Sequence, residues 1–317
     1  MILPRFLLRE VKESFGLSFY TKAQQFQIRY RCEVKNLSSK NIKFAVIFPI
    51  PPNTNNQTIK ATKFTPSNTK FGQDKTFGNR YVYWNAQIKP KESKTFEEEF
   101  LAEISPVKIE KNKNFKISDY KSEKLYTRNE KHVNFKNDRI KKLAAKIQLS
   151  NLDVLSTARS LNNFVAESLN YGNPVEGLYS SVESIMSKQT DCGGFASLLT
   201  ALLRYYGIPA RIVSGYLLSP HSSIMHAWVE FMLPNGVWTP VDPTIENLLK
   251  KRSTKRSGKF GFIGSDHLIL SYGSDIKIEI NGKFNTMDIL QNPTIISASG
   301  PASSFKSETI LTAILKK

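Results

Sequence analysis

Cys192 is the residue of this sequence that is best placed to act as a nucleophile. It follows Asp191 and precedes Gly193 and Gly194, at the start of a strongly amphipathic segment that predicts a helix. In the first turn of a helix, a thiol feels the positive end of the helix dipole and the free backbone N–H groups, which favour the thiolate. The same N–H groups can hold a developing oxyanion. The predicted chemistry is therefore nucleophilic attack on a carbonyl group.

His226 and Asp242 supply the base and the orienting acid that such a nucleophile needs. His226 lies near the start of an alternating strand, Asp242 ends the next strand, and residues 234–236 (Pro-Asn-Gly) predict a hairpin between them. A two-residue loop would pair His226 with Ile245, about 10 Å beyond Asp242 at the rise of a strand. We therefore predict a longer turn or a bulge, which brings Asp242 to His226 so that His226 can take the thiol proton.

Helices and strands in the second half of the chain must position these side chains. Beyond residue 150 the apolar residues recur with the helical period, and Asp153 and Ser180 are predicted helix caps. The third helix begins at Cys192 and ends at Gly207. We expect the strands that follow to span residues 210–218, 225–233, 237–241, 268–272 and 276–280.

The first third of the sequence predicts strands. Apolar and polar residues alternate in several short runs separated by turn-rich stretches, and Glu98 is the one residue off the pattern in the last run. This spacing is typical of an antiparallel β-sandwich of about 110 residues. Residues 105–146 carry 13 Lys or Arg against 5 acidic residues, which favours a charged connector. We therefore expect an N-terminal β-sandwich domain at 1–110, a basic linker at 111–139 and a catalytic core at 140–317.

Four sequence blocks, in this order, resemble the core of the transglutaminase-like superfamily, prokaryotic branch. They are TDCGGFASLL (190–199), LLRYYGIPARIVSGY (202–216), HAWVE (226–230) and WTPVDPT (238–244). The resemblance covers roughly residues 140 to 280. It implies an α+β architecture with a papain-like core of helices packed on an antiparallel sheet. It also implies a catalytic triad of Cys192, His226 and Asp242 without a metal or cofactor.

The resemblance leaves the acyl acceptor open, because the superfamily includes cross-linking enzymes, peptidases, glycan-removing amidases and inactive scaffolds. We expect hydrolysis of peptide or side-chain amides through a thioester, since water is always present and no dedicated amine site is visible. Transamidation of protein glutamine is one alternative. A non-catalytic binding or scaffold protein is the other, and the retention of all three triad residues argues against it.

For the remaining cysteine, two other histidines and Gln189, the sequence does not favour a catalytic role. Cys32 lies on the apolar face of a strand and is expected to be packed. His221 is expected in a solvated loop. His267 opens an apolar strand and is expected to be structural, with support of the triad residues as the less favoured alternative. Gln189 is too weak a candidate for an oxyanion-hole residue to be adopted.

Composition limits the remaining classes. The 317 residues carry a net charge of +18, which predicts weak, non-specific contact with anionic polymers beside a protein or peptide substrate. Two cysteines 160 positions apart do not suggest a disulfide framework or a metal site. No apolar run is long enough for a membrane span, and the N-terminus does not resemble a signal peptide, so a cytoplasmic protein is expected.

Overall fold

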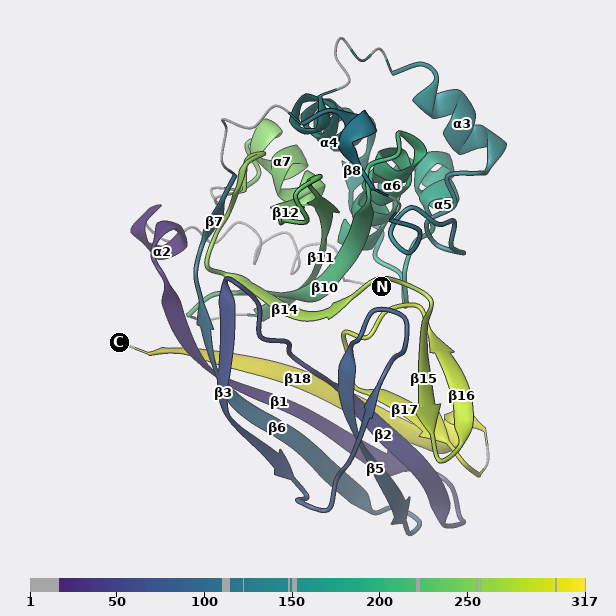
Figure 1. Ribbon diagram of the computed structural model, residues 1–317. Helices are drawn as coiled ribbons and strands as arrows, with labels where there is room; N and C mark the ends of the chain where they lie inside the picture. Colours follow the sequence, from purple (N-terminus) through teal and green to yellow (C-terminus); the bar gives the residue numbers. More distant parts are fainter. Residues whose placement is uncertain are drawn as a thin grey trace.

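The computed structural model describes residues 17–109, 115–121, 123–147, 149, 153–220, 223–254, 256, 258–299 and 301–316. The fold is α+β, as predicted, and its sheets are mostly antiparallel. In Figure 1 long twisted strands form the lower half and most of the helices gather around a second sheet in the upper half. Within the described residues, no helix is long and apolar enough to cross a membrane.

The lower half is a β-sandwich of two four-stranded antiparallel sheets. The first sheet has the order β18 (Phe305–Lys316), β1 (Gln24–Asn36), β6 (Ser93–Ile104) and β3 (Gln57–Thr65). The second has the order β17 (Thr294–Ser297), β2 (Ile42–Ile50), β5 (Arg80–Ile88) and β4 (Lys70–Gln73). The alternation along β1 explains its place, because Phe26, Ile28 and Tyr30 are fully buried while the polar residues between them are more exposed.

Both ends of the chain build this sandwich, which corrects the domain division predicted from the sequence. β18 pairs with β1 along the whole strand, from Gln25 opposite Lys316 to Asn36 opposite Phe305, and β17 pairs with β2. Residues 294–316 therefore belong with the sandwich and not with a core at 140–317. The alternation that would have revealed β18 is blurred, because Ile310 and Ile314 lie on its exposed face.

The predicted basic linker at 111–139 is also corrected, since its described residues pack into the fold. Val133 is fully buried, and Glu130 forms a buried ion pair with Arg204, with Oε2 2.9 Å from Nη1. The backbone N–H of Ala210 donates to the carbonyl of Tyr126. Charge density alone therefore misled the prediction, because it does not show that Glu130 pairs with Arg204 and that Val133 is buried.

The upper half contains the antiparallel sheet β12-β11-β10-β14 with helices packed against it. Its strands are β10 (Ala210–Leu218), β11 (Ser223–Met232), β12 (Trp238–Val241) and β14 (His267–Tyr272). The helices are α3 (Asp138–Ala144), α4 (Val154–Ser168), α5 (Ser181–Ser187), α6 (Cys192–Tyr205) and α7 (Pro243–Lys250). Phe195, Leu199 and Leu202 of α6 are fully buried, so this helix lies at the centre of the hydrophobic core.

Short elements connect these layers. The described chain begins with α2 (Leu17–Thr21), and a parallel pair, β8 (Asn170–Tyr171) and β9 (Gln189–Thr190), precedes α6. The other short elements are β7 (Val107–Lys108), η1 (Ile117–Asp119), β13 (Phe262–Ile263), β15 (Ile276–Ile280), β16 (Lys283–Met287) and η2 (Ala302–Ser304).

Side-chain amides join the sandwich to β14, which runs between the two halves in Figure 1. The Gln57 side chain donates to the carbonyl of Ile269 at 2.9 Å and accepts from its N–H at 2.8 Å. Asn79 makes the same two-way contact with Tyr272, with both distances 2.8 Å. The sandwich thus satisfies backbone groups at the β14 edge of the sheet β12-β11-β10-β14.

Candidate active site

Cys192 occupies the first helical position of α6, as the sequence predicts. Asp191 is the N-cap: its Oδ1 accepts the N–H of Gly194 at 3.3 Å, and its Oδ2 accepts the N–H of Val175 at 3.2 Å. These contacts fix the start of the helix and hold the 173–179 segment beside it. Cys192 is partly exposed whereas Cys32 is buried, so the structure separates the two thiols as expected.

Gly194 allows the helix start to lie close to the preceding strand. A Cβ atom at this position would lie 1.9 Å from Oγ1 of Thr190 and 2.7 Å from Oγ of Ser184. The close approach places β9, and through it the parallel partner strand β8 with Tyr171, next to the thiol. The glycine is therefore required by packing as well as by access to the thiol.

His226 and Asp242 meet as the sequence predicts, with His226 Nε2 2.6 Å from Asp242 Oδ2. The turn between their strands is longer than two residues, because the N–H of Leu233 donates to the carbonyl of Val237. The β11–β12 register places Val229 opposite Val241 without an irregularity. Extended past the end of β12, this register makes Asp242 a diagonal neighbour of His226 on the same face of the sheet. The turn is longer than two residues, as predicted, but it does not place Asp242 directly opposite His226. The two residues meet as diagonal neighbours, without a bulge.

Asp242 also caps helix α7, which was not predicted from the sequence. Its Oδ1 accepts the N–H groups of Thr244 and Ile245, both at 2.9 Å, while Oδ2 faces His226. The carboxylate is fully buried, and the helix start fixes its orientation. The Asp242-Pro243 pair, with proline in the first turn, is the sequence signal for this helix.

The buried contacts change the protonation of both residues. Burial lowers the pKa of His226, but the charge and hydrogen bond of Asp242, together with a hydrogen bond to Cys192, raise it to about 9. Burial raises the pKa of Asp242, but His226 and His267 hold it well below its usual value. Nε2 of His226 is hydrogen-bonded to Asp242. The other ring nitrogen, Nδ1, is therefore the one that can exchange a proton with the Cys192 thiol.

The sequence predicted a structural role for His267 within its strand. In the structure His267 also contacts Asp242. Its Nε2 lies 3.3 Å from Oδ2 of Asp242, and its Nδ1 lies 2.8 Å from Oδ1 of Asp266. Asp266 in turn accepts from Nη1 of Arg256 at 2.6 Å. The signal available in the sequence was the Asp266-His267 pair at the strand start, which does not show its partner.

Trp228 and Gln291 support the histidines. The Trp228 ring stacks on His226 at 6.0 Å between centroids and meets the His267 ring edge-on at 5.1 Å. The side chain of Gln291, a residue that was not singled out from the sequence, donates to the carbonyls of Gly215 and His226 at 2.7 and 2.9 Å. Gln291 precedes β17, so a segment that enters the sandwich also holds the strand of the candidate base.

His226, Asp242 and His267 bring three potential metal-ligand atoms within 4.8 Å of one another. However, His226 Nε2 and Asp242 Oδ2 are 2.6 Å apart. Two ligand atoms on one tetrahedral zinc ion, each about 2.0 Å from the metal, would be roughly 3.3 Å apart. The observed distance is that of a charge-assisted hydrogen bond, so the geometry fits a proton-transfer site better than a metal centre.

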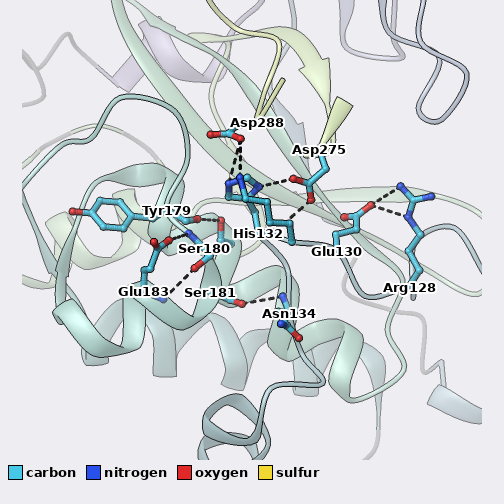
Figure 2. Close-up of polar contacts among 12 residues, drawn as sticks. Arg128, Glu130, His132, Asn134, Tyr179, Ser180, Ser181, Glu183, Asp275 and Asp288 are labelled. Atoms are coloured by element: carbon cyan, nitrogen blue, oxygen red, sulfur yellow. Dashed lines mark hydrogen bonds and ion pairs between the residues drawn. The ribbon is translucent and has the colours of Figure 1, made fainter. Parts of the chain in front are cut away.

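A second group of this kind consists of His132, Asp275 and Asp288 and shares no residue with the triad (Figure 2). Its Nδ1 is 2.7 Å from Asp275 Oδ1 and its Nε2 is 3.5 Å from Asp288 Oδ1. Lys131 also approaches Asp288, at 3.4 Å. The group joins the 128–134 segment to the residues that flank the β15–β16 hairpin.

Two further residues considered from the sequence do not contribute to this site. Gln189 lies in β9 with an exposed side chain, which gives no support to a role in the oxyanion hole. His221 lies outside the described residues.

Comparison with known proteins identifies the class of this core. Residues 141–243 match the Transglutaminase-like superfamily. A crystal structure from Cytophaga hutchinsonii, described as that of a candidate cysteine protease, aligns with a TM-score of 0.59 at 18% identity, covering 89% of this chain and 93% of that chain. The chain therefore carries a transglutaminase-like core in the same fold.

Particular relatives are found in Pseudomonas aeruginosa. A protein-glutamine gamma-glutamyltransferase is 40% identical over an alignment of 65 residues. The alignment covers 17% of this chain. The match spans only 10% of the length of that curated relative. The periplasmic domain of TgpA aligns with a TM-score of 0.36 at 14% identity, covering 78% of this chain and 94% of that domain.

Proposed function

We propose that this protein is a cysteine-dependent acyl-transfer enzyme that hydrolyses peptide or side-chain amides. The observation that carries the proposal is the buried His226–Asp242 contact of 2.6 Å beside a partly exposed thiol at a helix start. The Cys192 sulfur contributes to the raised pKa of His226, because the imidazolium form is attracted by a neighbouring thiolate and can donate to it.

The reaction follows from these positions. The Cys192 thiolate attacks the amide carbonyl carbon, and the positive end of the α6 dipole stabilises the developing oxyanion. The C–N bond breaks as His226 gives its proton to the leaving amine, and an acyl thioester remains. Water then attacks the thioester, His226 accepts its proton, and the C–S bond breaks to release the acid and the thiolate. Asp242 keeps the imidazole oriented throughout.

Transamidation is the second candidate, in which a primary amine replaces water in the last step. The match to a protein-glutamine gamma-glutamyltransferase over 65 residues favours it. We place hydrolysis first because water needs no binding site of its own. The substrate proposed in both cases is a protein or peptide.

A peptide library incubated with the protein, with and without an added primary amine, tests the proposal by mass spectrometry. We expect cleaved or deamidated peptides in both conditions, and amine adducts in place of them if transamidation dominates. Cys192→Ala should abolish every product. The matched control is Cys32→Ala, which removes the buried thiol of the sandwich and should retain activity. Products that persist in Cys192→Ala, or peptides unchanged by the native protein, would refute the enzyme and favour a scaffold.

A further inference from the structure

A chain of buried charged groups continues from the triad to the loop after α7. Asp242 contacts His267 at 3.3 Å, His267 contacts Asp266 at 2.8 Å, and Asp266 contacts Arg256 at 2.6 Å. The side chains of these four residues are no more than 2% exposed. Such groups are costly to bury unless each has a partner of opposite charge.

The charges alternate along this chain when both histidines are protonated. Burial lowers the pKa of His267, but Asp266 and Asp242 raise it to about 9. Burial raises the pKa of Asp266, but His267 and Arg256 bring it below its usual value. The four groups from Asp242 to Arg256 then sum to zero. Transfer of a proton from Cys192 to His226 adds one negative and one positive charge, so the whole chain stays neutral.

We propose that His267, held by Asp266 and Arg256, is a positioning residue that balances the charge of Asp242 and thereby sets the pH at which Cys192 and His226 form their ion pair. This inference rests on the proposed function, because it assigns a role within the same site. His267 touches no reacting atom and acts through Asp242. The contacts that support this role join three segments, which are the start of α7, the loop after α7 and the start of β14.

The direction of the effect follows from the groups that face His267. These are Asp242 at the start of α7, Asp266 before β14, His226 on β11 and, through Asp266, Arg256. In His267→Gln a neutral amide replaces the imidazolium of His267, so Asp242 loses one of its positively charged neighbours. The potential around His226 and the neighbouring thiol becomes more negative, which holds the proton on His226 to higher pH and disfavours the negatively charged thiolate.

The size of the shift follows from the separation of the two histidine rings, whose centroids are 5.9 Å apart. A unit charge at that distance moves a titration by about one to two pH units when the effective dielectric constant is about 20 to 40. The thiol of Cys192 is farther from His267 than His226 is. We therefore expect the midpoint of the Cys192 alkylation profile to shift to higher pH by about one unit in His267→Gln.

Alkylation of Cys192 by iodoacetamide, followed from pH 4 to pH 10 in the native protein and in His267→Gln, tests this proposal without a substrate. The matched control is His132→Gln, which replaces another buried histidine that lies between two carboxylates (Figure 2). We expect the profile of the control to overlay that of the native protein. An unshifted profile in His267→Gln, or an equal shift in His132→Gln, would overturn the inference.

The same profiles distinguish the two proposals. If Cys192 of the native protein does not react below pH 7, the ion pair and the proposed function fail together. If it does react there, only the His267 comparison decides the inference. Should His267→Gln not fold, nitrogen-15 spectra of labelled histidine in the native protein decide instead. Two protonated ring nitrogens on His267 at pH 7 support the inference, and a neutral ring contradicts it.

Discussion

At the residue scale, protonation in this protein is set by buried partners. His226 and His267 lie on either side of one carboxylate, and each keeps its proton to a higher pH than an exposed histidine does. Glu98 is the opposite case, because it lies between the sheets of the sandwich and neither of its oxygens has a hydrogen-bond partner among the described groups. The buried histidines therefore have a carboxylate partner in Asp242, whereas the buried Glu98 carboxyl group has no partner among the described groups and opposes folding.

The histidine contacts predict how stability depends on pH. The pKa of His226 rises from 6.5 to about 9 on folding, so its stabilising contribution is fully present below pH 6.5 and is lost as the pH rises through 9. The pKa of Asp242 is lowered, so its contribution is present above about pH 4 and is lost at lower pH. Urea unfolding should therefore show a decline in the free energy of unfolding between pH 6.5 and 9. The decline should be smaller in Asp242→Asn, and an identical slope in that variant would contradict the prediction.

Glu98 gives a second prediction. Burial raises its pKa well above 4.5, so the folded protein retains a proton that the unfolded chain releases, and stability falls as the pH rises above 4.5. Glu98→Met should raise the free energy of unfolding at pH 7 by about 1–3 kcal/mol and by less at pH 4.5. The matched control is Glu99→Met, whose ion pair with the exposed Arg29 is screened by solvent, so this substitution should change the free energy of unfolding little. A loss of stability in Glu98→Met would show that the carboxyl group has a partner.

At the element scale, close contacts between backbones decide where the site residues lie. Gly215 of β10 lies opposite His226 of β11 and opposite Ile269 of β14, beside an irregularity in the register. A Cβ at Gly215 would lie 1.8 Å from the carbonyl oxygen of Leu268 and 3.2 Å from the Trp228 ring. Only glycine permits this approach, which brings His267 and His226 to the same carboxylate.

Gly215→Ala should therefore separate β14 from β10. We expect a loss of about 1–3 kcal/mol in the free energy of unfolding, together with an altered pH profile of Cys192 alkylation, because His267 moves away from Asp242. Gly236→Ala is the control, since a Cβ added there would have no described atom within 4 Å and its φ is +84°. That variant should cost about 1 kcal/mol through backbone strain and keep the alkylation profile. A native profile in a folded Gly215→Ala would contradict this account.

At the scale of the whole molecule, the sandwich and the transglutaminase-like core share one hydrophobic cluster. Tyr216 and Leu268 of the core sheet pack in the same buried cluster as Phe26 and Phe48 of the sandwich. Tyr30 also bonds to Tyr216, with the two hydroxyl groups 3.1 Å apart. β17 and β18 follow the core in the sequence and pair with β2 and β1, respectively, so both sheets of the sandwich contain strands from either side of the core.

This arrangement predicts one unfolding transition. The buried thiol of Cys32 becomes reactive when the sandwich opens, and the helical circular dichroism signal reports mainly on the core. The two probes should show the same urea midpoint. Deletion of residues 305–316, which removes one of the two strands paired with β1, should lower both midpoints together. Separate midpoints in the full-length protein would indicate two independent domains.

Local sequence patterns were sufficient to predict α6, the β10 strand, the hairpin after β11 and the meeting of His226 with Asp242. These features depend on neighbours close in the chain, where periodicity, capping and turn residues act directly. The tertiary structure alone decided the return of β17 and β18 to the sandwich and the contact of His267 with Asp242. It also decided the packing of the charged segment before α3. Those contacts join residues far apart in sequence, and their partners are selected by shared burial and charge, which no local pattern records.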